Sequence, residues 1–213
     1  INHNILRNIS NNQHLMSVQT VGNPYLLYLT RVNGVCCCFF VDKKIKSGYT
    51  YPRIICVKYR FAEDLYDGTV FWGELIRDVS QRWFFMLSDI LVYRNIKLSD
   101  KNTKYKYELI YNILSNHYSA DSVLDTCPIQ VKKIFNYPEY QRMIKEYIPS
   151  LSYRCRGICF NTLNSKYSSY LYIFPRNEWI SNRSIQDVMR ELNAEGFNME
   201  DIDDENNGNQ QSN

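Results

Sequence analysis

The side chains best suited to covalent or metal chemistry are the seven cysteines of the chain. Three of them, Cys36–Cys38, lie inside the apolar run 35–41, where cysteine is expected to behave as a small buried hydrophobic residue. Cys155 and Cys159 have a spacing that suits a zinc site, but no second pair and no nearby histidine completes it. Because no secretory signal is recognisable, we expect free thiols in a reducing compartment and no metal site.

The three histidines do not indicate acid–base or nucleophilic catalysis. No serine, cysteine or carboxylate forms a convincing catalytic arrangement with His3, His14 or His117. The chain also contains neither a P-loop nor a GxGxxG motif. Nucleoside triphosphate hydrolysis and dinucleotide binding therefore have no support, and we expect no cofactor.

Charge is distributed unevenly along the chain. The 213 residues include 25 basic and 22 acidic ones, which gives a net charge of +3. Six acidic residues follow Ala194; without them 16 acidic residues remain against the 25 basic ones, so the rest of the chain carries +9. A basic body predicts a polyanionic partner, and the acidic segment 195–213 predicts a disordered tail. This tail and a loosely attached arm, residues 1–20, are the places where a protein partner could bind.

The first half of the chain has patterns typical of β-strands. Asn33-Gly34 tolerates positive φ and predicts a tight hairpin between strands 25–30 and 35–41. Further strands are expected over 52–59, 69–76 and 83–93.

Helical spacing follows in the second half. Residues 104–117 place Tyr107, Ile110, Tyr111 and Leu114 on one face. This order predicts an α+β domain, residues 21–194, of twisted antiparallel sheets with flanking helices. The remaining elements that we expect are a helix over 138–147, strands over 156–160 and 170–174, and a helix over 184–193.

The composition favours a soluble globular protein. Hydrophobic residues make up 45% and charged residues 22%, so a packed core is expected and wholesale disorder is excluded. No apolar run approaches the roughly 20 residues that a membrane-spanning helix needs. We expect no membrane partner and a cytoplasmic location, with entry into the nucleus left open.

Five blocks resemble, in order, the motifs of the covalent nucleotidyltransferases, the family of mRNA guanylyltransferases and polynucleotide ligases. The resemblance spans roughly residues 20–180 and implies the fold of that family, without its second, OB-type domain. The blocks are Arg31-Val32-Asn33-Gly34, Phe71-Trp72-Gly73-Glu74-Leu75, Phe84-Phe85-Met86-Leu87-Ser88-Asp89-Ile90-Leu91, Arg156-Gly157-Ile158-Cys159-Phe160 and Leu171-Tyr172-Ile173-Phe174-Pro175.

Departures from these motifs predict that the chain is not an enzyme. The family's nucleophile is the lysine of the first motif, whose free amine attacks the α-phosphate of the nucleotide, and Arg31 stands at that position. A guanidinium, with a pKa above about 12, does not supply a free amine. Arg156 replaces the acidic residue of the fourth motif, and Tyr172 and Phe174 replace the paired lysines of the fifth.

Further features resemble snurportin-type RNA cap-binding domains, a non-catalytic branch of the same fold. Lys46-Ser47-Gly48-Tyr49 follows the second strand as a similar tetrapeptide does there, and Leu87-Ser88-Asp89 ends an aromatic strand. Tyr172 stands near the place of that family's base-stacking tryptophan. The resemblance implies non-catalytic binding of the 5′ cap, a methylated guanosine, of RNA.

The candidate site residues follow from this resemblance. Tyr172 and Trp72 are expected to stack on the cap base, unless they pack in the core instead. Glu74 is expected to accept hydrogen bonds from guanine or ribose. Asn33 and Asp89 are further polar candidates, each with a structural role as the alternative. The candidates for the triphosphate are Arg31, Lys46, Arg53 and Arg156.

Two alternatives to cap binding stay open at this point. The first is an active guanylyltransferase or RNA-ligase-like enzyme that uses another lysine, for instance Lys44 or Lys46. The second is a protein-interaction subunit with a vestigial cleft. The preferred cap methylation and the role of the RNA in translation, import or processing are also open.

Overall fold

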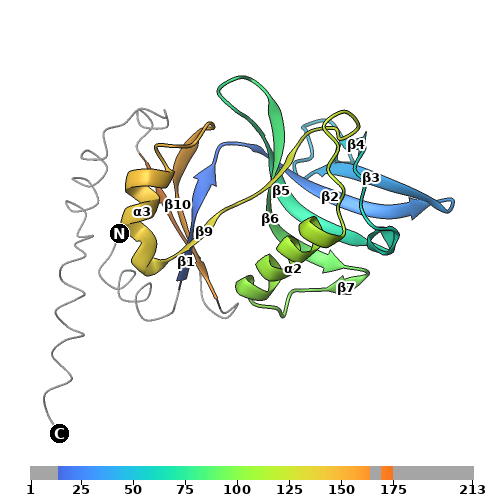
Figure 1. Cartoon of the computed structure of the whole chain (residues 1–213). Helices are drawn as coiled ribbons and strands as arrows, with labels where there is room; N and C mark the ends of the chain where they lie inside the picture. Colours follow the sequence, from blue (N-terminus) through green and yellow to red (C-terminus); the bar gives the residue numbers. More distant parts are fainter. Residues whose placement is uncertain (1–13, 164–168, 175–213) are drawn as a thin grey trace, which may run out of the picture.

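The computed structural model describes residues 14–163 and 169–174, which form two β-sheets, two helical regions and a short 3₁₀ helix (Figure 1). The seven-stranded sheet has the order β4-β3-β2-β5-β6-β7, and β8 pairs in parallel with β6. The four-stranded sheet has the order β11-β10-β1-β9. The strands are β1 His14–Thr20, β2 Asn23–Val32, β3 Val35–Asp42, β4 Ile54–Val57, β5 Thr69–Arg77, β6 Trp83–Tyr93, β7 Ile96–Lys97, β8 Ile129–Val131, β9 Ile134–Asn136, β10 Cys155–Thr162 and β11 Tyr170–Ile173.

The hairpin of β2 and β3 confirms the prediction made from the Asn-Gly pair. Asn33 and Gly34 have φ values of 50° and 79°, as a two-residue turn with two positive φ angles requires. Cys36 and Cys38 share one face of β3, but Cys36 lies beside the hairpin turn, opposite Arg31, whereas Cys38 lies deeper in the sheet, opposite buried Leu29. Only Cys38 is buried, whereas Cys36 is exposed, so the expectation of a wholly buried triplet is wrong. All seven cysteines are free thiols.

One face of the seven-stranded sheet packs against α2, Thr103–Asn116. Asn102 caps this helix, since its side chain accepts a hydrogen bond from the backbone N–H three residues on. Ile110 and Ile113 are fully buried, but Tyr111, which the spacing places inward, is 48% exposed. The helix is confirmed, with its buried stripe shifted toward Ile113.

The four-stranded sheet packs between the second helical region and the seven-stranded sheet (Figure 1). The predicted helix over 138–147 is a continuous run of 3₁₀, α and π turns: η2 Tyr137–Glu139, α3 Tyr140–Arg142 and η3 Met143–Tyr147. Gly157 on β10 is required by close packing, because a Cβ there would lie 2.0 Å from the carbonyl oxygen of Tyr172 on β11.

The predicted N-terminal arm does not extend over His14–Thr20. These residues form β1 between β10 and β9, and Met16 and Val18 are fully buried. The signal was an alternation of apolar and polar residues from Met16 to Gln19, which is too short to stand out beside the Asn-rich residues before it. Strands β7, β8 and β9 and the short 3₁₀ helix η1, Glu63–Tyr66, were also not predicted.

Two sheets with few helices are compatible with the predicted α+β class. Among the residues that the structure describes, no helix is both long and apolar enough to cross a membrane. The helix predicted over 184–193 and the tail over 195–213 lie outside the described residues.

Candidate functional site

A cleft of about 600 Å³ lies where the two sheets meet. One wall comes from β5 and β6, the opposite wall from β1 and β10, and α2 and the link between β8 and β9 complete it. The lining residues are Ser17, Gln19, Trp72, Glu74, Ser88, Asp89, Leu91, Ser99, Lys101, Asn102, Thr103, Lys106, Tyr107, Lys132, Cys159, Asn161, Thr162, Leu163 and Ser169.

Three residues singled out in the sequence meet on the wall of the seven-stranded sheet: Trp72, Glu74 and Asp89. Trp72 on β5 is the register partner of Asp89 on β6, and the pairing shifts between Trp72 and Gly73. This irregularity is a β-bulge, which re-aims side chains locally. The Lys43 ammonium lies 3.9 Å from the centre of the Trp72 ring, so one ring face already holds a cation.

Both carboxylates of this wall have protein partners. The Thr20 hydroxyl, at the end of β1, donates a hydrogen bond to Glu74 and so links the two sheets at the cleft. Lys106 Nζ on α2 lies 3.1 Å from Asp89 Oδ2. The side chains of this pair are 15% and 35% exposed, so it is only partly screened by water. Asp89 therefore orients Lys106 and neutralises its charge.

Lys132 is the most buried cation of the cleft, with 7% exposure. It follows β8, which belongs to the seven-stranded sheet, and precedes β9, which belongs to the four-stranded sheet. Its backbone N–H donates to the Leu87 carbonyl over 2.8 Å, which fixes the link between the sheets. Among the described residues, no carboxylate forms an ion pair with Lys132. Because no carboxylate balances this cation on the wall of the cleft, the position favours an anionic ligand.

The opposite wall offers polar groups from the four-stranded sheet. Cys159 Sγ donates to Gln19 Oε1 over 2.8 Å, and Asn161 Nδ2 donates to Ser17 Oγ over 3.3 Å. Burial raises the pKa of the Cys159 thiol, and the charge of Lys132 opposes this rise. The thiol therefore stays protonated at neutral pH and acts as a hydrogen-bond donor, not as a nucleophile.

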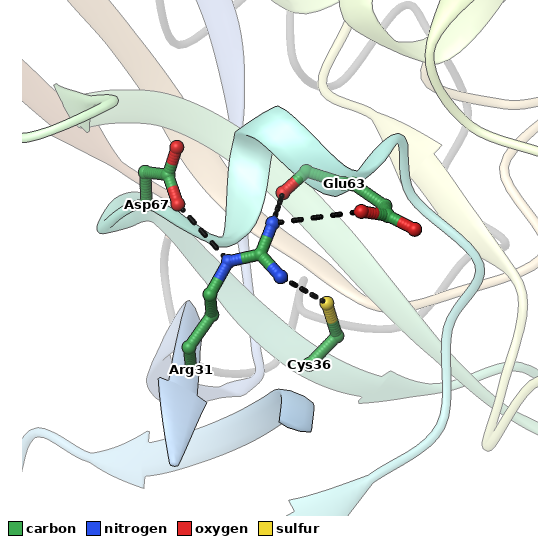
Figure 2. Close-up of polar contacts among 4 residues, drawn as sticks. All are labelled: Arg31, Cys36, Glu63 and Asp67. Carbon is green, nitrogen blue, oxygen red and sulfur yellow. Dashed lines mark hydrogen bonds and ion pairs between the residues drawn. The ribbon is translucent and has the colours of Figure 1, made fainter. Parts of the chain in front are cut away.

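Arg31 does not line the cleft, and Figure 2 shows its contacts with Cys36, Glu63 and Asp67. Its guanidinium lies 3.1 Å from Asp67 Oδ1 and donates to the Glu63 carbonyl over 2.9 Å and to Cys36 Sγ over 3.4 Å. The hydrogen bond that Arg31 donates to the Asp67 carboxylate raises the pKa of Arg31 above its usual value. By alternation along β2, Arg31 shares a face with buried Leu29, opposite the face that carries Trp72. Arg31 therefore anchors the hairpin to η1.

Tyr172 is a core residue, which corrects its assignment as a stacking platform. It is 7% exposed and packs in the apolar cluster that the four-stranded sheet forms with the second helical region and with residues of β5 and β6, where its ring centre lies 5.8 Å from that of Phe174 at 73°. The run Leu171 to Phe174 alternates across β11, with Leu171 and Ile173 outward. The even positions therefore point inward, and the ring of Tyr172 presents no open face to a base.

The other predicted contacts lie outside the lining of the cleft. Asn33 forms the hairpin turn, and Lys46 and Arg53 lie on the exposed β3–β4 loop. Arg156 on β10 is half-buried and its Nε has no hydrogen-bond partner in the described structure. The structure thus brings together three of the nine predicted site residues: Trp72, Glu74 and Asp89.

Sequence reasoning missed the cations and the polar wall of the cleft. Lys106 and Lys132 come from a helix face and from a link between sheets, so no short motif contains them. Ser17 and Gln19 belong to the strand that was taken for an arm, where alternation was the available signal. Within the described ranges, no group of three or more potential ligand side chains is placed to hold a metal ion.

Comparison with known proteins gives one family. The family model described as mRNA capping enzyme, catalytic domain, matches residues 1–170. No curated protein matches the chain. The family match contradicts the prediction that the chain is not an enzyme, because it points to a guanylyltransferase. The prediction failed because it rested on Arg31. That residue faces away from the cleft, so its identity does not indicate whether a lysine inside the cleft can act as the nucleophile.

Proposed function

The chain belongs to the family of mRNA capping enzyme catalytic domains, and from this premise we propose that its cleft binds the guanosine nucleotide of RNA 5′ ends. Glu74 supports this, since a carboxylate accepts hydrogen bonds from the N1 and N2 donors of guanine, which adenine lacks. Trp72 on the same wall offers a ring for stacking. Lys132, which has no carboxylate partner among the described residues, supplies positive charge for the phosphates.

We further propose guanylyl transfer through a lysine of this cleft. In guanylyltransferases, the family that the motifs resemble, a lysine amine attacks the α-phosphorus of the nucleotide. A nitrogen–phosphorus bond forms, the bond to the bridging oxygen breaks, pyrophosphate leaves with its electron pair, and the amine proton passes to water. The nucleophile must therefore be a lysine that reaches the phosphate and is not held by a carboxylate.

Lys132 fits this requirement best, and this observation carries the proposal. Of the three lysines that line the described cleft, Lys101 pairs with Asp100 and Lys106 pairs with Asp89. Lys132 is buried and has no carboxylate partner among the described residues. The lysines named from the sequence alone, Lys44 and Lys46, do not line the cleft.

Binding is tested by titrating GTP, a methylated cap dinucleotide and ATP against the protein while following tryptophan fluorescence. We expect saturable quenching by both guanine nucleotides and weaker binding of ATP. Glu74→Gln should reduce the preference for guanine. Equal affinity for GTP and ATP in the unaltered protein would contradict a guanosine site.

Transfer is tested with α-labelled GTP and Mg²⁺, followed by denaturing electrophoresis. We expect a labelled protein band that acid removes and that Lys132→Arg abolishes. Lys101→Arg is the matched control, because it changes a neighbouring cleft lysine that a carboxylate already holds. A band that survives Lys132→Arg would assign the transfer to another lysine, and no band with the unaltered protein would contradict transfer while leaving binding intact.

A further inference from the structure

The β3–β4 loop, residues 43–53, exposes two aromatic rings. Tyr49 is 70% exposed and Tyr51 is 78% exposed. Neither ring contacts another ring or a cation within the described part of the chain. Ile45 on the same loop is 55% exposed. Several large apolar side chains gathered on one exposed loop are typical of a recognition surface, not of a core.

The same part of the chain is strongly basic. Residues 41–60 contain six lysines and arginines and a single acidic residue, whereas the whole chain has 25 against 22. The acidic residue, Asp42, is already paired with Arg53 at 3.5 Å. Arg60, beyond the loop, is paired with Asp121 at 3.0 Å. The positive charge that remains belongs to Lys43, Lys44, Lys46 and Lys58, which are exposed, so the loop favours a polyanion.

The loop begins at the rim of the cleft. The backbone N–H of Lys43 donates to the carbonyl of Pro24 over 3.2 Å, and Pro24 is the register partner of Glu74. The side chain of Lys43 lies over the ring of Trp72. A chain that leaves the cleft past Trp72 and Glu74 therefore reaches this loop first.

The loop is ordered at its base and at its turn. The Asp42 N–H donates to the Arg53 carbonyl over 2.9 Å, and the Lys44 N–H donates to Asp42 Oδ1 over 2.9 Å. The Tyr49 N–H donates to the Lys46 carbonyl over 3.1 Å, across a turn that contains Gly48 with φ of 86°. These bonds fix the backbone of the loop at these points before a ligand arrives, which lowers the entropic cost of binding.

We propose that the β3–β4 loop binds the single-stranded RNA that follows the 5′ nucleotide held in the cleft. Tyr49 and Tyr51 stack on successive bases, and the loop lysines contact phosphates, the combination by which single strands are held without sequence preference. An acidic protein segment would match the charge but not the stacking faces beside a nucleotide cleft. The inference rests on the proposed function, because the cleft sets which end of the RNA lies nearby.

The test compares GTP with a capped RNA of about ten nucleotides, a length that one such binding surface accommodates. The variant is Tyr49→Ala with Tyr51→Ala, and the control is Tyr105→Ala with Tyr111→Ala, two tyrosines of α2 that are 44% and 48% exposed. Fluorescence anisotropy of the labelled RNA should show a loss of affinity between about fivefold and about a hundredfold in the loop variant, the range for losing base stacks. GTP affinity should stay unchanged, and the control should bind both ligands normally.

Each outcome separates the inference from the proposed function. If the loop variant binds the capped RNA as tightly as the unaltered protein, the inference is wrong, whatever the result with GTP. If GTP does not bind but RNA binding still depends on the tyrosines, the loop is an RNA site and the proposed cleft function fails. If a polyglutamate peptide displaces the RNA completely and binds equally well to the loop variant, charge alone explains binding and the stacking role is overturned.

Discussion

Arg31 and Lys132 are two cations that lie near strand ends and differ in how their charge is balanced. Arg31 is bound by Asp67 and Glu63 and is accessible to water. Lys132 is 7% exposed, lines the cleft and has no carboxylate partner among the described residues. The first arrangement is complete without a ligand, whereas the second gains from an anion.

This difference in charge balance indicates which of the two cations is available to bind a ligand. Arg31 sits inside a recognisable sequence block, yet its geometry serves the hairpin. Lys132 belongs to no recognisable block, yet two sheets meet around it. Charge balance and burial, which only the fold provides, separate a structural cation from one that can meet a phosphate.

The largest effect is expected in the packed wall that supports the cleft. Tyr172→Ala should lower the free energy of unfolding by about 3–5 kcal/mol, because it leaves a large cavity in the apolar cluster that the four-stranded sheet forms with the second helical region. Tyr172→Phe should cost about 1 kcal/mol or less, since the ring remains. Denaturant unfolding measures both. If Tyr172→Ala lowers the free energy of unfolding only slightly and also weakens nucleotide binding, Tyr172 belongs to the nucleotide site and not to the core.

Lys132→Ala should have the next largest effect, on binding. Removing a charge-assisted contact to a phosphate should weaken GTP binding by about 1.5–3 kcal/mol. Guanosine, which has no phosphate, should bind the variant and the unaltered protein alike. Calorimetric titration of both ligands checks this. Equal losses for GTP and guanosine would mean that Lys132 supports the fold and does not meet a phosphate.

Much of the fold was predictable because local patterns specify it. The Asn33-Gly34 turn needs positive φ, and the strands on each side alternate visibly, so the hairpin follows from local preference. α2 was equally clear from its apolar spacing. β8 and β9 were missed because three-residue strands carry no period, and only pairing with β6 and β1 creates them.

The candidate site was predictable only where one strand pair contains it. Trp72, Glu74 and Asp89 lie on neighbouring strands and were identified. Lys106 and Lys132 reach the same cleft from a helix and from a link between sheets, which are distant in sequence. Tyr172 and Arg31 were misplaced because a sequence block does not reveal which strand face turns toward the cleft.

Glu74→Gln should produce a smaller effect than Lys132→Ala, and one that depends on the base. The amide keeps an oxygen for Thr20 but accepts poorly from both guanine donors at once. We expect GTP binding to weaken by about 1.5 kcal/mol while ATP binding changes little. Competition titration of the two nucleotides gives the ratio. An equal change for ATP would assign Glu74 to the ribose or to the link between the sheets.

Arg31→Ala should have the smallest effect, and it tests the conclusion that Arg31 has a structural role. Its partners are exposed carboxylates, and water screens such pairs, so Tm should fall only slightly at low salt and the difference should vanish at high salt. GTP affinity should stay within about twofold of the unaltered protein, because the side chain lies on the sheet face away from the cleft. Arg31→Lys should likewise not add a labelled GMP band to a protein that carries Lys132→Arg. A band restored by that lysine would show that position 31 reaches the nucleotide after all, and the assignment of the hairpin cation as structural would be wrong.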